Sequence, residues 1–117
     1  MHLPSECTLL RIFIGENDRS DGRLLYETIV ESAHRRGLAG ATVLRGILGF
    51  GANSRIHTSR ILRLSQDLPV VVEIVDTKEK IVEFLPELDA LITEGMVTIE
   101  KADVLFYRHS SNGKGER

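Results

Sequence analysis

Apolar residues along the chain alternate between strand-like and helix-like spacing. The chain begins with one strand-like segment followed by one helix-like segment. The run rich in Leu and Ile at residues 8–14 predicts a strand. Across residues 25–33, apolar side chains recur at helical spacing with charged residues off the stripe, which predicts a helix. Ser20 or Asp21 is the expected N-cap, and Gly37 suits the left-handed position after the helix ends.

The chain from residue 41 onwards predicts two more strands around a long loop, and a last strand near the end. Residues 41–48 form the second expected strand, which Gly46 interrupts with a bulge or a close backbone approach. Residues 69–75 contain four valines and an isoleucine and predict a buried strand. The stretch between them, 49–68, is mostly irregular, and loops of that length tend to be functional. A longer, more mixed strand is expected over residues 96–107.

A second helical stripe covers residues 81–91. The preceding Asp76-Thr77-Lys78-Glu79 resembles a capping box, and Pro86 is expected to kink or split the helix because it removes one backbone hydrogen bond. This order of elements predicts an α+β, ferredoxin-like βαββαβ fold, with a four-stranded antiparallel sheet and both helices on one face. One domain is expected over residues 1–109, followed by a flexible polar tail over 110–117.

The predicted sheet is apolar on both faces. Leu9 and Phe13 point to one face of the first strand, while Leu10, Ile12 and Ile14 point to the other. Two helices cover only one face, and an apolar second face is uncommon on a soluble monomer. The pattern therefore predicts a closed homo-oligomer in which another copy of the chain covers this face.

Charge is unevenly distributed along a chain whose net charge is only −2. Residues 32–66 contain six arginines and no acidic residue, which leaves nine Lys and Arg residues against all 17 acidic residues in the rest of the chain. A segment of one sign in an otherwise acidic protein suggests an anion site. The alternative is a solvated loop whose arginines meet acidic residues elsewhere on the surface.

Glycines and arginines concentrate at the start of this segment. Glycines let successive backbone N–H groups face one anion, and arginines add charge-assisted hydrogen bonds. The alternative is a glycine-rich strand exit without a ligand. The glycine spacing does not match a dinucleotide fingerprint, no Walker lysine is present, and the strands lack the aromatics of an RNA-binding sheet, so no nucleic-acid partner is expected. The candidate binding residues here are Arg45, Gly46, Gly49, Phe50, Gly51 and Arg55.

The remaining candidates for chemistry favour structural roles. Cys7 is the single cysteine, which excludes an internal disulfide and favours a reducing, cytoplasmic compartment as the location. We find no secretory signal and no apolar segment long enough to span a bilayer. His57 has no neighbour at metal-ligand spacing, and Glu73 is expected to pair with an arginine rather than act as a tuned acid. No nucleophile–base set assembles, so a binding protein rather than an enzyme is expected.

Three blocks of sequence resemble the PII-like signalling superfamily, and most closely the uncharacterised DUF family one-ninety. They are Gly40-Ala41-Thr42-Val43, the motif Gly49-Phe50-Gly51 before a long polar loop, and the strand beginning Asp67-Leu68-Pro69-Val70 with its following helix. The resemblance covers residues 8–108. It implies a PII-like homotrimer with an adenine nucleotide (AMP, ADP or ATP) in the cleft between neighbouring subunits.

The resemblance also assigns site residues. Gly49, Phe50 and Gly51 match the motif that opens the mobile loop, Gly95 matches a glycine before the last strand, and Arg108 stands in for a basic residue at that strand's end. The Arg-Gln pair of true PII proteins is replaced by Ala52-Asn53, so the phosphate-contacting arginine is expected to be Arg45 or Arg55.

Taken with the residues, the resemblance predicts a regulatory protein that signals through the 50–68 loop to a target protein, with a membrane transporter or channel as the candidate target. The alternative is a metal-responsive trimer resembling the copper-tolerance relatives of PII. A small enzyme is the third hypothesis.

Overall fold

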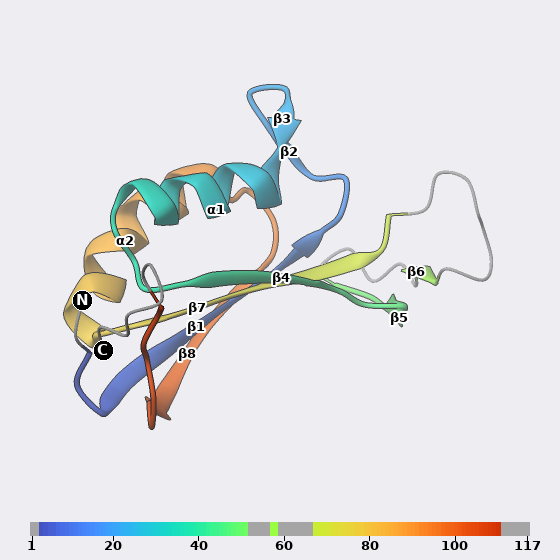
Figure 1. Cartoon of the computed structure of the whole chain (residues 1–117). Coiled ribbons are helices and arrows are strands. Elements are labelled where there is room, and N and C mark those ends of the chain that lie inside the picture. The colour runs from blue at the N-terminus through green and yellow to red at the C-terminus, as the bar shows by residue number, and fades with distance from the viewer. Residues whose placement is uncertain (1–2, 52–56, 59–66, 111–117) are drawn as a thin grey trace.

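A computed structural model describes residues 3–51, 57–58 and 67–110 as an antiparallel sheet covered by helices on one side only (Figure 1). The strand order is β4-β7-β1-β8, the arrangement that the ferredoxin-like α+β prediction requires, and the prediction is confirmed. The main elements are β1 (Glu6–Gly15), α1 (Leu25–Arg35), β4 (Ala41–Arg45), β7 (Pro69–Asp76), α2 (Lys78–Leu91) and β8 (Met96–Asp103).

Two short hairpins extend from this frame. The segment expected to be a polar loop contains β2 (Arg19–Ser20) and β3 (Arg23–Leu24), joined by a turn in which Asp21 and Gly22 have φ of 51° and 79°. Positive φ at both central residues is typical of tight hairpin turns. Beyond β4, the strands β5 (Leu48–Gly49) and β6 (His57–Thr58) pair with each other, so the stretch predicted as irregular also holds a hairpin.

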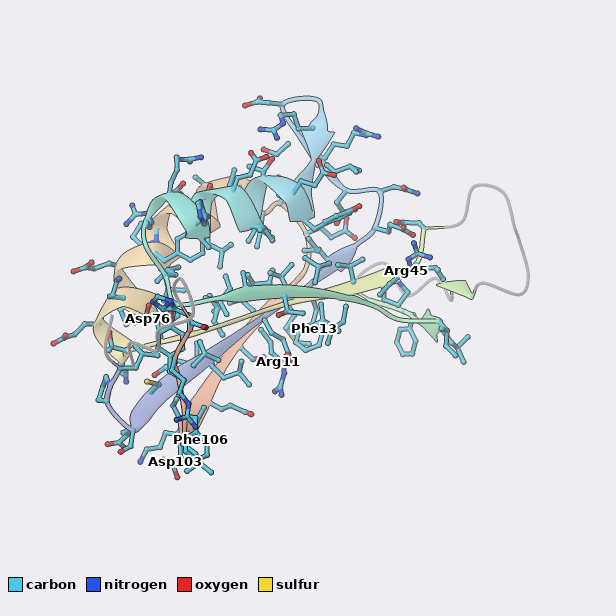
Figure 2. The ribbon with its side chains drawn as sticks, in the orientation of Figure 1. Arg11, Phe13, Arg45, Asp76, Asp103 and Phe106 are labelled. Carbon is cyan, nitrogen blue, oxygen red and sulfur yellow. The ribbon has the colours of Figure 1, made fainter. Side chains whose placement is uncertain are left out.

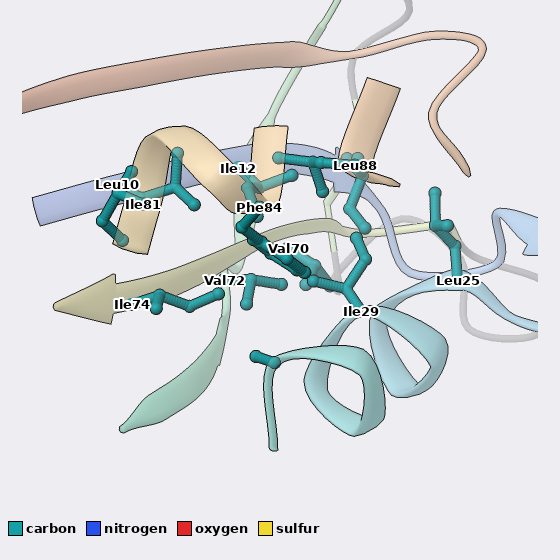
Figure 3. Packing of buried hydrophobic residues seen from close by; sticks show 12 residues of the cluster. Leu10, Ile12, Leu25, Ile29, Val70, Val72, Ile74, Ile81, Phe84 and Leu88 are labelled. Carbon is teal, nitrogen blue, oxygen red and sulfur yellow. The ribbon is translucent and has the colours of Figure 1, made fainter. Parts of the chain in front are cut away.

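The hydrophobic core lies between the sheet and the two helices (Figure 3). Alternate residues of β1 and β7 point into it because successive side chains of a strand face opposite sides. The helices contribute one stripe each, as their spacing predicted. The largest fully buried core side chains are Phe84, Leu10, Ile12, Ile29, Ile74, Ile81, Leu88 and Val72.

Helix α1 begins differently from the prediction. Its N-cap is Leu24, in extended conformation and without a side-chain capping bond, so the assignment of Ser20 or Asp21 as the cap is wrong. Both residues are taken up by the β2–β3 hairpin, which delivers the chain directly into the helix. The predicted end is correct, since Gly37 has φ of 74° and its N–H bonds to the carbonyl oxygen of His34.

Helix α2 and strand β8 also depart from expectation. The hydroxyl of Thr77 accepts the backbone N–H of Lys80 at 3.2 Å, so the cap is Thr77 and the capping box from Asp76 to Glu79 does not form. The helix continues through Pro86 without splitting. Because Pro86 has no N–H, the carbonyl oxygen of Val82, one turn earlier, loses its helical hydrogen bond. The side chain of Val82 is exposed. The final strand ends at Asp103 rather than at residue 107.

A buried carboxylate joins the start of α2 to the connection between α1 and β4. Asp76 is fully buried, and its oxygens accept the backbone N–H of Ala39 at 2.8 Å and of Thr77 at 2.6 Å. Lys80 Nζ donates to the carbonyl oxygen of Gly37 at 2.8 Å, and the hydroxyl of Tyr107 donates to that of Ala39 at 3.0 Å. This connection is therefore held from both the helix side and the C-terminal segment.

Acidification is expected to lower the free energy of unfolding partly through Glu87. A hydrogen bond from Arg36 holds the pKa of this carboxyl below its usual value, against the opposing effect of burial. Because the folded pKa is lowered, the contribution is complete above the unfolded value of about 4.3 and is lost as pH falls through the folded pKa. The contribution is expected to be below about 1 kcal/mol, since the pair is partly exposed.

Urea midpoints measured between pH 7 and pH 3 check this expectation. The control is Arg36→Ala, which removes the hydrogen-bond donor to Glu87. In this variant, the urea midpoint should fall less steeply between pH 7 and pH 3. An unchanged profile in that variant would contradict a role for the pair.

Candidate functional site

A cleft of about 540 Å³ opens at the end of the sheet where β1 finishes and β7 and β8 begin. Phe13 and Pro69 come from the strand ends, Phe50 and Gly51 from the segment after β5, and Gly95 from the turn between α2 and β8. The structure thus brings together three residues that the sequence assigned to one site although up to 45 positions separate them, namely Phe50, Gly51 and Gly95.

Glycines 46 and 49 let the chain leave β4 close to Pro69. The N–H of Gly46 donates to the carbonyl oxygen of Pro69 at 2.8 Å. A Cβ at Gly46 would lie 3.0 Å from Pro69 Cγ, and one at Gly49 would lie 3.2 Å from it. These two glycines border the cleft and have a packing role there, which is the role expected of a glycine-rich strand exit. Phe50, just beyond them, is 67% exposed and available to a ligand.

Gly95 shapes the cleft from the other side. Its φ is 148°, and a Cβ on it would lie 2.6 Å from the carbonyl oxygen of Phe13. Side chains other than hydrogen are strained in this backbone region and have no room at this contact. The glycine therefore allows the turn before β8 to close against the end of β1.

The predicted arginines are placed less uniformly. Arg45 lies beside the cleft, where its guanidinium pairs with Glu16 at 3.3 Å and remains exposed (Figure 2). Arg55 lies outside the described residues. Arg108 stacks over the ring of Phe106 at 4.5 Å, in the segment after β8 and at the opposite end of the sheet from Gly95. One chain therefore does not bring Arg108 to the cleft.

Acidic residues in the cleft were missed by the sequence reasoning. Asp18, Asp67 and Glu94 line it, and none of the described lining residues is basic. Asp18 accepts the N–H of Gly15 at 2.9 Å and Asp67 that of Asn17 at 2.8 Å, so both carboxylates hold the turn after β1. Their positions, in a polar loop and at the end of the acid-free segment, gave no local signal that they meet in space.

Two further residues resolve as structural. Glu73 accepts a hydrogen bond from Arg11 at 3.0 Å, which confirms that it is a paired carboxylate. The thiol of Cys7 is buried and donates to the carbonyl oxygen of Pro4 at 3.3 Å. Burial, followed by the charge of Asp76, raises the pKa of this thiol, so Cys7 is poorly suited to act as a nucleophile.

Comparison with known proteins shows the family. A family profile described as DUF190, Uncharacterized ACR, COG1993, matches residues 7–104. The chain belongs to the DUF190 family. A UPF0166 protein of Aquifex aeolicus is 42% identical over 98 residues, which cover 84% of this chain and 92% of the relative. A UPF0166 protein of Methanocaldococcus jannaschii is 38% identical over 97 residues, covering 82% and 89% respectively.

Solved structures show the wider fold relationship of this DUF190 chain. CPII, a nitrogen regulatory PII-like protein from Thiomonas intermedia K12 bound to ADP, AMP and bicarbonate, superposes with a TM-score of 0.57 at 16% identity. The match covers 85% of this chain and 88% of CPII. The match shows that the chain shares the fold of a PII-like protein, and the DUF190 membership that the sequence predicted is confirmed. The DUF190 match includes the cleft residues and ends before Arg108.

Two other findings bear on the alternatives. Over the described residues, no group of three or more His, Cys, Asp or Glu side chains is arranged to hold a metal ion. The side chain of His57, on which the metal hypothesis depends, lies outside the description. Neither helix described is long and apolar enough to cross a bilayer.

Proposed function

We propose that this DUF190 protein is a PII-like regulator located in the cytoplasm. It forms a homotrimer, binds an adenine nucleotide (AMP, ADP or ATP) in the cleft between subunits, and signals through the 50–68 loop to a target protein. The observation that carries the proposal is the cleft itself, which unites Phe50 and Gly51 at the base of that loop with Gly95. A ligand bound there contacts the first residues of the loop, so it can favour one loop state over another.

The lining of the cleft fits the uncharged parts of a nucleotide. Phe13 and Phe50 offer aromatic surface for a base, since bases stack on such rings in a sequence-tolerant way. The carboxylates of Asp18, Asp67 and Glu94 can accept hydrogen bonds from ribose hydroxyls or an amino group. These carboxylates disfavour phosphate at the same spot, so the phosphates must meet positive charge from outside the described lining.

In this proposal, three arginines provide that positive charge, two from the subunit itself and one from its neighbour. Arg45 borders the cleft within the subunit, Arg55 follows closely in sequence, and Arg108 is available from a neighbouring subunit. The open sheet face supports assembly, because Leu44 and Met96 on it are exposed and large apolar patches usually mark interaction sites. The target is proposed to be a protein, with a membrane transporter or channel as the candidate.

Removing Phe50 is expected to weaken nucleotide binding by about 5- to 150-fold, since base–aromatic stacking is worth about 1–3 kcal/mol. Calorimetry of wild type and Phe50→Ala with ATP, ADP and AMP measures the effect. The matched control is Leu48→Ala, because Leu48 is also exposed on the same hairpin but does not line the cleft.

The same titrations separate the other hypotheses. Absence of nucleotide binding at millimolar concentration, or equal affinity of wild type and Phe50→Ala, contradicts the proposal. Binding of a divalent metal that is lost in His57→Ala would favour the metal-responsive alternative. Turnover of the nucleotide would favour an enzyme.

A further inference from the structure

The face of the sheet away from the helices carries just three charged side chains among its described strand positions. They are Arg11 on β1, Glu73 on β7 and Glu100 on β8. The other strand positions on this face are apolar apart from Thr42 and Thr98, which flank Glu73 and Arg11 in one row across the sheet, while Glu100 lies in the next row opposite Leu9. An otherwise apolar surface thus holds one compact charged site near its middle.

The three charged groups meet in one network. Arg11 Nε donates to Glu73 Oε2 at 3.0 Å, and Arg11 Nη1 donates to Glu100 Oε2 at 3.2 Å. The exposed fractions of the three side chains are 33%, 31% and 57%. Figure 2 shows Arg11 projecting from the sheet on the side opposite to the helices.

Apolar side chains border this network on both sides. On one side of the network, Phe13 lies opposite Val71 and Met96, and Leu44 lies opposite Val71 in the same row. On the other side of the network, Leu9 lies opposite Val75. Two purely apolar faces can slide past one another, and strand alternation alone does not choose between offsets of two residues. A polar group in such an interface fixes one register because other offsets leave it unpaired.

The network is also self-complementary. A guanidinium has five N–H donors, and the hydrogen bonds of Arg11 to described residues use two of them. Glu100 is the most exposed of the three and brings one negative charge in excess of the Arg11–Glu73 pair. A second copy of the chain therefore presents what this face lacks, an acceptor for Arg11 and a donor for Glu100.

We infer that the Arg11–Glu73–Glu100 network is the specificity determinant of self-assembly on the open face, fixing the register and the number of subunits. The inference rests on the proposed homotrimer. It identifies the occupant of the face as a second copy of this chain and assigns the choice of stoichiometry to three residues. A target protein bound to this face is the alternative that the experiment excludes.

The first test is Arg11→Met, which leaves two carboxylates without their counter-charge on a surface that assembly covers. Truncating one partner of an interfacial charge pair costs about 2–5 kcal/mol, so the concentration at which half the chains assemble should rise at least about 30-fold. Sedimentation and native mass spectrometry of the full chain measure it. Arg11→Lys, which keeps the charge and loses the forked geometry, should fall between wild type and Arg11→Met.

The second test removes all three charges together in Arg11→Met/Glu73→Leu/Glu100→Leu. This variant should associate at least as strongly as wild type but populate more than one stoichiometry. The matched control is Arg36→Met, since Arg36 pairs with Glu87 on the helix side and should leave assembly unchanged.

The outcomes are distinguishable. A wild-type trimer with unchanged assembly in Arg11→Met, or a single trimeric species in the triple variant, overturns this inference and leaves the proposed function standing. A wild-type chain that stays monomeric, with or without nucleotide, overturns both. Circular dichroism of each variant verifies that any loss of assembly occurs in a folded chain.

Discussion

Replacing Gly95 with alanine is expected to lower the free energy of unfolding by about 2–4 kcal/mol. Two effects combine: the backbone at φ of 148° is strained for any side chain, and the new Cβ would lie 2.6 Å from the carbonyl oxygen of Phe13. The neighbour at this contact is backbone near the end of the central strand β1, so relief requires a shift of β1 or of the turn before β8. Urea denaturation measures the change.

Two other glycines separate these effects. Gly22 has φ of 79° with no atom within 4 Å of an added Cβ, so Gly22→Ala should show the backbone strain alone, about 1 kcal/mol. Gly51 lines the same cleft, no atom of the described residues lies within 4 Å of a Cβ added there, and Gly51→Ala should stay within about 0.5 kcal/mol of wild type. If Gly95→Ala behaves as Gly51→Ala does, the close approach does not constrain the turn.

Asp76→Ala is expected to lower the free energy of unfolding by about 3 kcal/mol, because it leaves the part-buried N–H groups of Ala39 and Thr77 without their acceptor. It also removes the negative charge 3.8 Å from Lys80 Nζ. Hydrogen exchange adds a local measurement: the amide of Ala39 should exchange much faster in the variant even under conditions where the chain is folded.

Two variants sharpen this second prediction. Asp76→Asn keeps one acceptor oxygen and should lose about half as much free energy of unfolding. Asp89→Ala alters an exposed carboxylate on the same helix and should change it by less than about 0.5 kcal/mol. Unaltered exchange at Ala39 in Asp76→Ala would show that the connection between α1 and β4 is held by other contacts.

The order of elements was predictable because the main strands and helices carry strong periodic patterns. In β7, Val70, Val72 and Ile74 are buried while the residues between them are half-buried, and a run of valine and isoleucine broken only by Glu73 indicated this strand. The β2–β3 hairpin was missed because strands of two residues have no period to detect. The α1 cap was missed because Leu24 acts through its backbone conformation alone.

The candidate site was predictable in part. Phe50, Gly51 and Gly95 came from a motif resemblance, and the cleft brings them together. Asp18 and Asp67 could not be found this way, since their meeting near Gly15 depends on how β1 and β7 pair rather than on either loop's own sequence. Arg108 illustrates the opposite limit, because this residue was assigned from a motif but lies after β8, at the opposite end of the sheet from Gly95.

The bond between Gly46 and Pro69 has a consequence for how this family can diversify. This hydrogen bond, 2.8 Å from N to O, holds together the two ends of the segment between Gly46 and Pro69. The strand pairing of Leu48 with Thr58 is a second link across the same segment. With the ends anchored, doubling the length of chain between them costs only about 0.6 kcal/mol of closure entropy. Insertions and deletions between these anchors can therefore change the surface of this segment while the sheet beneath keeps its stability.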